Sequence, residues 1–333
     1  MKKLNKILLL VLIAGFIVGC KPKTAKQSFK PEITGQAGQV IVVTTPGKWE
    51  SMVGDTLRSI LLSPEPSLPR LESKFDPVFI PIDGFGALYR TQRNILLIKI
   101  GPEFTERKIT LQKGSYAKSQ LIITIKAPSD TAFVKLVHEN REKLINIIQD
   151  TERLRLMETY KANQNAEITE MLKNEHNINM VVPKGYEINI DKPGFVWLAN
   201  NHRNVIENLV IYYYNYTDDS TFTKNYLVDK RNEYIKQIPG EVEGSYVTTE
   251  MRAPVLEEAF NLHNKYTVQL RGLWRIQDGL AMGGPFLSIT QLDKQRNRVV
   301  TIEGFVFAPS EEKRNYIRRA EAILYSTDFT GEE

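Results

Sequence analysis

The chain has 333 residues, of which 42% are hydrophobic and 25% are charged, and its 44 basic and 39 acidic residues give a formal net charge of +5. This length is ample for a hydrophobic core. The excess of positive charge lies near the N-terminus, with three lysines among the first six residues and four among residues 21–38. From Gln39 onward the chain has 37 basic and 38 acidic residues. Because the body lacks a basic stripe, no nucleic acid is expected as a partner.

The first twenty residues have the pattern of an export signal. A basic start precedes an apolar run from Ile7 to Val18, which as a helix spans only about 18 Å and is too short for a bilayer. A short apolar run after a basic start is typical of a signal peptide. The following Gly19 and Cys20 resemble a bacterial lipobox. The resemblance implies a lipoprotein signal peptide at residues 1–19 and a membrane anchor through diacylglyceryl on Cys20; the alternative is a cysteine in a signal that is discarded whole.

Cys20 is the only cysteine, so the exported chain has no disulfide to stabilise it. Residues 20–38 are rich in Pro, Lys, Gln, Ser and Gly and predict a lipidated flexible stalk.

Residues 39–165 are interpreted as an N-terminal α+β subdomain. A β-branched strand is predicted at Gln39–Thr45, and apolar residues at helical spacing follow between Trp49 and Leu61. After a proline-rich loop, further strands are expected at Val78–Ile82, Ile95–Ile100 and Leu121–Ile125.

A long glycine-free and proline-free stretch, residues 129–182, predicts the helical connection between the halves. Ser129 is a suitable N-cap. One helix from Thr131 to Glu175 would be about 68 Å long, outsized for a small domain. Because the apolar stripe lapses across residues 161–167, we expect two helical segments or one kinked helix.

Residues 166–333 are interpreted as a C-terminal α+β subdomain. Asp191-Lys192-Pro193-Gly194 favours a type II turn. Helices are predicted at residues 222–238 and near the C-terminus, with strands between them. The whole pattern predicts an α+β fold of two subdomains, with mostly antiparallel sheets packed by helices and joined by the long or kinked helix.

Catalytic motifs fail at identifiable positions. Gly84-Phe85-Gly86 follows a strand, but Tyr89 occupies the third glycine position of a dinucleotide-binding motif. The chain has no P-loop and no G-x-S-x-G sequence. His138 and Glu139 lack the second histidine of a zinc-protease motif, and the other histidines show no metal-ligand spacing. We therefore expect a non-catalytic protein with neither metal nor cofactor; the alternative is an envelope hydrolase that uses a carboxylate pair.

Tyr212, Tyr214 and Tyr216 alternate along one predicted strand and therefore share a face. They predict either an aromatic platform for a glycan or partner peptide, or an ordinary sheet face, because tyrosine favours strands.

Gly283-Gly284-Pro285 lies between two apolar strands and predicts a tight connection or bulge in a hairpin. The alternative is a bare backbone that a ligand or partner approaches closely, with Met282 and Phe286 as apolar flanks.

Four short sequences carry a family resemblance: "VPKGY", "FVWL", "RGLW" and, most specific, "MGGPF". With the lipobox they resemble an uncharacterised family of Bacteroidota lipoproteins, domain of unknown function 4837, over nearly the whole exported chain. The resemblance implies a lipid-anchored envelope protein without assigned activity. The second half is also similar to PsbP-like α/β/α sandwiches, which are mostly binding modules.

The residues after Cys20 bear on location. Related lipoproteins that reach the cell surface carry acidic residues there, and an aspartate would favour inner-membrane retention. Lys21-Pro22-Lys23 fits neither pattern, so we expect the periplasmic face of the outer membrane, with a partner protein or envelope polymer as ligand.

The lipobox interpretation predicts that Cys20→Ala leaves an unlipidated precursor, because no other thiol can accept the diacylglyceryl group. Labelled palmitate fed to cells should enter the natural chain and not the variant. Equal labelling of both would contradict the interpretation.

Overall fold

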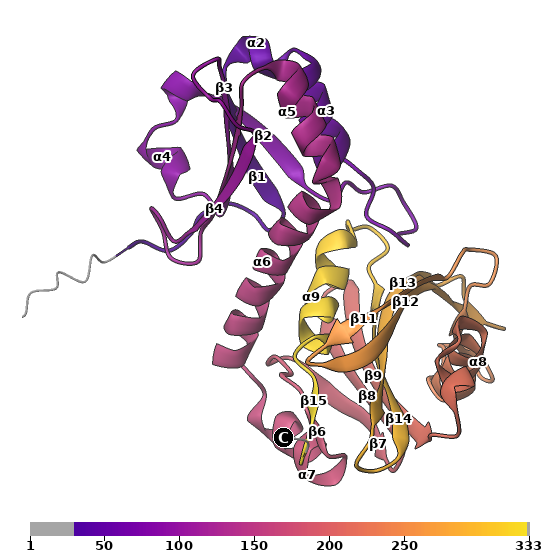
Figure 1. Cartoon of the computed structure of the whole chain (residues 1–333). Coiled ribbons are helices and arrows are strands. Elements are labelled where there is room, and N and C mark those ends of the chain that lie inside the picture. The colour runs from indigo at the N-terminus through magenta and orange to yellow at the C-terminus, as the bar shows by residue number, and fades with distance from the viewer. Residues whose placement is uncertain (1–29, 332–333) are drawn as a thin grey trace, which may run out of the picture. The chain divides into compact units, whose positions relative to one another are not determined.

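The computed structural model describes residues 30–331, and Glu32–Glu333 form one compact unit by their contacts (Figure 1). The predicted signal peptide, Cys20 and most of the stalk lie outside the described residues. The stalk prediction is wrong for residues 32–38. The Thr34 N–H donates to the Thr91 carbonyl at 2.9 Å, and the Arg93 N–H donates to the Thr34 carbonyl at 3.1 Å. Backbone pairing thus holds a stretch whose composition is typical of a linker.

The first sheet has the strand order β2-β1-β3-β5-β4 (Figure 1). β1 pairs in parallel with β2 and β3, β3 pairs in parallel with β5, and β4 pairs antiparallel with β5. Its strands are β1 (Gln39–Thr44), β2 (Asp76–Pro81), β3 (Asn94–Ile100), β4 (Lys108–Lys113) and β5 (Leu121–Ala127). The expectation of a mostly antiparallel sheet is therefore wrong for this half. Residues 40–43 and 121–125 are continuously buried, as is typical of parallel strands covered on both faces.

Helices cover one face of this sheet and a short irregular segment covers the other. α3 (Met52–Leu61), α5 (Asp130–Glu139) and α6 (Arg141–Ala162) pack their apolar residues on the first face. On the other face Phe85 and Tyr89 pack against Ile41 and Ile95. They belong to the region of η1 (Ile82–Gly84) and α4 (Ala87–Arg90), while α2 (Pro46–Trp49) precedes α3.

The helical connection is broken where the sequence predicts it. The Ser129 hydroxyl caps α5 by accepting from the Ala132 N–H at 3.3 Å. α6 ends at Ala162, and α7 (Ala166–Glu175) starts after Asn165, whose side-chain oxygen accepts from the Ile168 N–H at 3.3 Å. The expected break within residues 161–167 is confirmed.

The second sheet is antiparallel throughout, in the order β10-β12-β13-β14-β9-β8-β7, with β11 also paired to β12. Its strands are β7 (Glu187–Lys192), β8 (Phe195–His202), β9 (Val205–Asn215), β10 (Tyr246–Thr249), β11 (Leu256–Leu262), β12 (Lys265–Gln277), β13 (Gly283–Asp293) and β14 (Arg298–Phe307). A separate pair joins β6 (Ile178–Asn179) to β15 (Asp328–Phe329). The predicted turn at residues 191–194 connects β7 and β8, with Gly194 at φ +83°.

Helices lie on both faces of the second sheet (Figure 1). One face packs against α7 and α9 (Arg314–Leu324), and the other packs against α8 (Lys224–Ile235), which follows η2 (Asp219–Phe222). This helix–sheet–helix order is the one that the PsbP-like resemblance implies. The α+β class is confirmed, with an antiparallel sheet in the second half.

α8 is attached to the sheet by a fully buried ion pair. The Arg231 guanidinium donates to both carboxylate oxygens of Glu303 on β14, at 2.7 and 2.6 Å. It also donates to the Thr249 hydroxyl at 2.7 Å and lies over the Phe286 ring. Burial raises the pKa of Glu303 and Arg231 opposes that rise. Bidentate geometry of this kind is what makes a buried pair tolerable.

α9 holds residues of both halves through its arginines. The Arg314 guanidinium donates to the Asp76 carboxylate at 2.6 Å, and Arg318 donates to Glu65 at 2.7 Å. Ile323 and Leu324 of the same helix are buried against the second sheet. The sequence pattern identifies the apolar face of α9, whereas the partners of Arg314 and Arg318 lie more than 200 residues away in the chain.

Gly283-Gly284-Pro285 is not a turn. All three residues lie in β13, opposite Arg275, Trp274 and Leu273 of β12, and no positive φ is recorded for either glycine. A Cβ atom on Gly284 would lie 2.0 Å from the Val306 carbonyl oxygen, and one on Gly283 would lie 2.6 Å from the Trp274 carbonyl oxygen. The glycines therefore permit a close approach of neighbouring backbone, so the predicted tight connection is wrong at these positions.

Glu303→Gln is expected to destabilise the fold by about 3–5 kcal/mol, because it leaves the Arg231 charge buried without a counter-charge. The free energy of urea unfolding measures this loss. The matched control is Glu233→Gln on α8, the helix that carries Arg231. It removes the exposed pair with Lys230 and should change stability by less than about 1 kcal/mol. Equal effects of the two substitutions would contradict the role given to the buried pair.

Gly284→Ala should lower the free energy of unfolding by about 1–3 kcal/mol, because the added methyl forces β13 away from the Val306 carbonyl. Gly47→Ala is the control, since no atom lies within 4 Å of its added Cβ. A Gly284→Ala protein as stable as the Gly47→Ala protein would show that the strands have room to part.

Candidate functional site

The three predicted tyrosines fall in three different environments, two on β9 and one just after it. Tyr212 is buried and stacks on Tyr234 of α8, with ring centroids 4.8 Å apart. Tyr214 is half-buried and lies 6.0 Å from the same ring. Tyr216 lies just beyond the end of β9, and its hydroxyl donates to Asp219 at 2.7 Å. α8 therefore covers the first two tyrosines, and the three do not form one open platform.

The segment from Met282 to Gly284 lines an open depression with a volume of about 890 Å³. Met282, Gly283 and Gly284 contribute to its wall together with charged residues such as Glu250 and Arg275. Phe286 does not: it is 1% exposed and lies beneath the Arg231 guanidinium. Of the four predicted contact residues, three line this depression and Phe286 belongs to the core.

A second cavity, which we call the aromatic pocket, has a volume of about 730 Å³ and three aromatic side chains in its lining: Tyr216, Phe222 and Tyr266. The Phe222 ring is 6.4 Å from that of Tyr216 and 5.6 Å from that of Tyr266, the latter edge to face. Tyr266 is 55% exposed, so its ring is open to solvent in the pocket wall. Only Tyr216 belongs to the predicted set.

Local backbone geometry places Tyr266 at the pocket. His263 and Asn264 form the two-residue turn between β11 and β12, both with positive φ, at 51° and 62°. Such a turn fixes the register of its hairpin. Tyr266 follows at the start of β12, while Phe222 ends η2, more than forty residues earlier in the chain. The sequence has no short-range signal that would bring these rings together.

The two acids of the aromatic pocket, Asp219 and Asp328, already accept hydrogen bonds within the protein. Asp219 accepts from the Tyr216 hydroxyl, and Asp328 accepts from the Lys265 ammonium at 2.5 Å. Burial tends to raise the pKa of Asp328, but hydrogen bonds from Lys265 and from the Phe329 N–H hold it below its usual value. Such a carboxylate stays ionised near neutral pH, so it can accept hydrogen bonds from a ligand and is poorly suited to act as a general acid.

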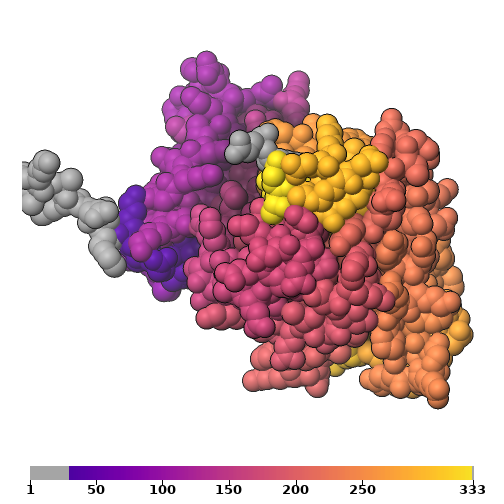
Figure 2. All heavy atoms as spheres, turned by 90° about the horizontal axis from the view of Figure 1, so that it is seen from below, coloured from indigo at the N-terminus to yellow at the C-terminus, as the bar shows by residue number. Residues whose placement is uncertain are grey.

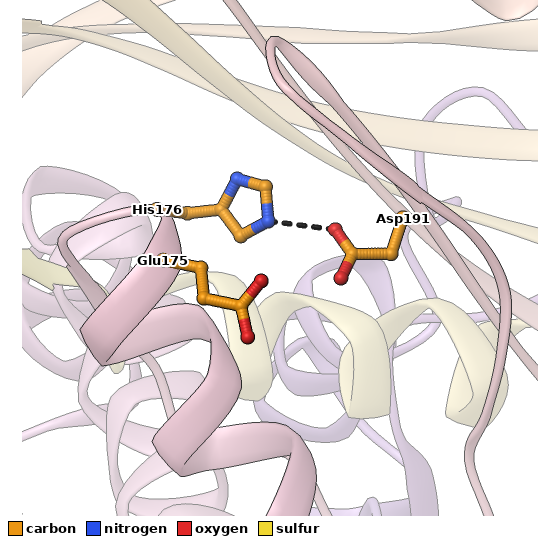
Figure 3. Close-up of side chains that lie close together, drawn as sticks. All are labelled: Glu175, His176 and Asp191. Atoms are coloured by element: carbon orange, nitrogen blue, oxygen red, sulfur yellow. Dashed lines mark hydrogen bonds and ion pairs between the residues drawn. The ribbon is translucent and has the colours of Figure 1, made fainter.

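A third group, which we call the three-residue cluster, brings together Glu175, His176 and Asp191 (Figure 3). One ligand atom from each lies within 4.8 Å of the others. His176 Nε2 is 2.8 Å from Asp191 Oδ1, and Nδ1 is 3.1 Å from the Tyr213 hydroxyl. The imidazole is buried, whereas both carboxylates are exposed. A search for spacing among histidines misses this cluster because its other members are acids, one of them on a different element.

The three-residue cluster lies at the C-terminal end of α7, beside the short β6–β15 pair. Figure 2 shows this side of the molecule, with the yellow C-terminal segment next to the magenta residues that follow α6.

Within residues 30–331 no helix has the length and apolar character needed to cross a membrane.

Structural comparison finds similar folds at low scores. The Ran-binding protein Mog1p of Saccharomyces cerevisiae is 14% identical, with a TM-score of 0.32, over 47% of this chain and 92% of its own. LpqN of Mycobacterium tuberculosis, described as involved in cell envelope biogenesis, is 14% identical, with a TM-score of 0.28, over 46% of this chain and 83% of its own. A protein from Bacteroides thetaiotaomicron is 11% identical, with a TM-score of 0.26, over 47% of this chain and 46% of its own. At these scores the likeness does not extend to function.

Family models match the two halves separately. Residues 33–161 match the model described as Domain of unknown function (DUF8532), and residues 165–326 match Domain of unknown function (DUF4837). The resemblance to the second family is confirmed, but its expected reach over nearly the whole exported chain is wrong, since the first half matches a different model. No curated protein gives a significant match. Residues 165–326, which match the family model described as domain of unknown function DUF4837, hold the whole three-residue cluster and every lining residue of the aromatic pocket except Asp328.

Proposed function

We propose that this protein is a lipid-anchored, non-catalytic envelope protein that binds an envelope polysaccharide in the aromatic pocket. The anchor is the diacylglyceryl group expected on Cys20, and the expected location is the periplasmic face of the outer membrane. The proposal treats the second sheet as a rigid support for a binding site, and it names sugar polymers as the ligand class.

The observation that carries the proposal is the gathering of Tyr216, Phe222 and Tyr266 around one open cavity. Aromatic rings offer large rigid faces that contact the apolar faces of sugar rings without much loss of side-chain freedom. The same cavity presents Asp219, Asn264 and Lys265, whose side chains donate to or accept from hydroxyl groups. Apolar faces with a few polar groups are typical of small-ligand sites.

The rival hydrolase would need one protonated and one ionised carboxylate near the scissile bond. The aromatic pocket offers Asp219 and Asp328. Each already accepts a hydrogen bond within the protein, and the pKa of Asp328 lies below its usual value. This arrangement favours binding over acid catalysis.

Tyr266→Ala is expected to weaken binding of the full-length protein to purified peptidoglycan sacculi about tenfold, equivalent to ~1.4 kcal/mol. Co-sedimentation in detergent measures the affinity, and the melting temperature checks the fold. Tyr116→Ala is the matched control, because Tyr116 is also exposed and lies outside the aromatic pocket. It should bind as the natural protein does.

Several outcomes would change the proposal. Equal binding by the Tyr266→Ala and natural proteins would rule out the aromatic pocket as the site. Capture of one protein by crosslinking in intact cells, lost in Tyr266→Ala and without any polysaccharide binding, would replace the polymer by a protein ligand. Release of soluble sugar from sacculi, abolished by Asp328→Asn, would replace binding by hydrolysis.

A further inference from the structure

The three-residue cluster has the donor set of a transition-metal site. Imidazole nitrogen and carboxylate oxygen are the ligands that zinc and related divalent ions share. Here they come from two elements, with Glu175 and His176 at the end of α7 and Asp191 on β7. In Figure 3 the Glu175 carboxylate points toward the gap between His176 Nε2 and Asp191.

We propose that Glu175, His176 and Asp191 bind a divalent transition-metal ion of the zinc class, through His176 Nε2 and one oxygen from each carboxylate. Two bonds of about 2.0–2.1 Å at a tetrahedral angle place their donor atoms ~3.3 Å apart. The observed separation of Nε2 and Asp191 Oδ1 is 2.8 Å, and all three donor atoms lie within 4.8 Å of one another. The shortest donor separation therefore has to widen by about 0.5 Å and the longest to close by up to about 1.5 Å to complete the site.

The electrostatic setting favours a cation. α7 has ten residues and ends at Glu175, so the negative end of its dipole faces the three-residue cluster. The nearby Arg298 guanidinium opposes a cation, but its Nε is 2.9 Å from the buried Asp293 carboxylate, which also pairs with Arg296. The two exposed carboxylates and the helix end lie at the proposed site itself and supply the negative charge that a cation needs.

The surroundings of His176 hold its ring in the orientation that a metal ligand needs. Nδ1 lies 3.1 Å from the Tyr213 hydroxyl, and Arg298 both donates to the His176 carbonyl at 2.6 Å and lies over the Tyr213 ring. When Nε2 binds the ion, the single proton of the neutral imidazole resides on Nδ1 and is donated to the Tyr213 oxygen. A metal-binding histidine ordinarily donates its other ring N–H in this way. Tyr213 is therefore a positioning residue.

The bound ion would join the end of α7 to the β7–β8 hairpin. In the chain only β6 stands between α7 and β7. Of the hydrogen bonds just described, only the one between His176 and Asp191 connects the end of α7 to β7. Three protein ligands leave at least one coordination position for water, as in open zinc sites. The site is separate from the aromatic pocket, whose lining contains none of its three residues.

The test uses full-length protein without a histidine tag, titrated with Co²⁺, whose visible absorption reports coordination, and then with Zn²⁺ in competition. We expect one Co²⁺ per chain, displaced by Zn²⁺. Asp191→Asn and Glu175→Gln should each weaken Co²⁺ binding at least roughly tenfold. The matched controls are Glu170→Gln on the same helix and the exposed His202→Ala, and both should leave affinity unchanged.

Tyr213→Phe separates positioning from ligation. It keeps the ring under Arg298 and removes the hydroxyl, so we expect about tenfold weaker binding with the same absorption spectrum. Hydrogen exchange should slow in residues 187–195 and in α7 when Zn²⁺ is added to the natural protein, and should not change in Asp191→Asn.

Absence of a Co²⁺ spectrum in the natural protein would overturn the proposal. So would binding that survives both Asp191→Asn and Glu175→Gln, because the ion would then lie elsewhere. Loss of binding in either control would likewise assign the ion to another site. Melting temperatures detect any loss of folding in Asp191→Asn or Glu175→Gln. If either variant fails to fold, unchanged Co²⁺ affinity in the folded Tyr213→Phe protein would contradict the proposal.

Discussion

The buried carboxylate of Asp293 organises the end of the second sheet on which both candidate sites depend. It accepts from Arg298 Nε at 2.9 Å and from Arg296 Nη1 at 3.3 Å, which closes the β13–β14 hairpin. Arg298 continues to the His176 carbonyl, and Arg296 donates to the Thr330 carbonyl at 3.0 Å. Because a carboxylate removed from water must be paired and hydrogen-bonded, this one group holds the hairpin, the end of α7 and the C-terminal segment in a fixed arrangement.

The two sites use this support in different ways. In the aromatic pocket the acids are already hydrogen-bonded, so a ligand meets aromatic faces and balanced charge, a setting suited to polyhydroxyl compounds. In the three-residue cluster two exposed carboxylates and one oriented imidazole meet at a helix C-terminus, which suits a cation. The depression beside Gly284 differs from both, because its glycines are explained by the packing of β13 against neighbouring backbone.

Local features of the fold could be predicted from the sequence, and features that depend on distant contacts could not. Ser129 as a cap, the break before Asn165 and the turn at Gly194 follow from the chemistry of adjacent residues. The sequence predicts an antiparallel first sheet where the structure has a parallel one, although the continuous apolar runs of β1 and β5 indicate strands buried on both faces. The place of Gly284 within a strand cannot be predicted from adjacent residues, because the Val306 carbonyl that excludes a side chain there lies on another strand. Tyr212 illustrates the same limit, since only α8 makes it core.

The position of α9 has a consequence for the order in which the chain can fold. Domains commonly fold from the N-terminus as synthesis proceeds. Residues 314–324 form α9, which supplies contacts to both halves. Its arginines pair with Glu65 and Asp76 of the first half, and its Ile323 and Leu324 pack on the second sheet. The first half therefore completes its ion pairs, and the second half its apolar core, only after almost the whole chain has arrived. The apolar core of the first half contains no residue of α9, so it can form before its ion pairs with Arg314 and Arg318 are made.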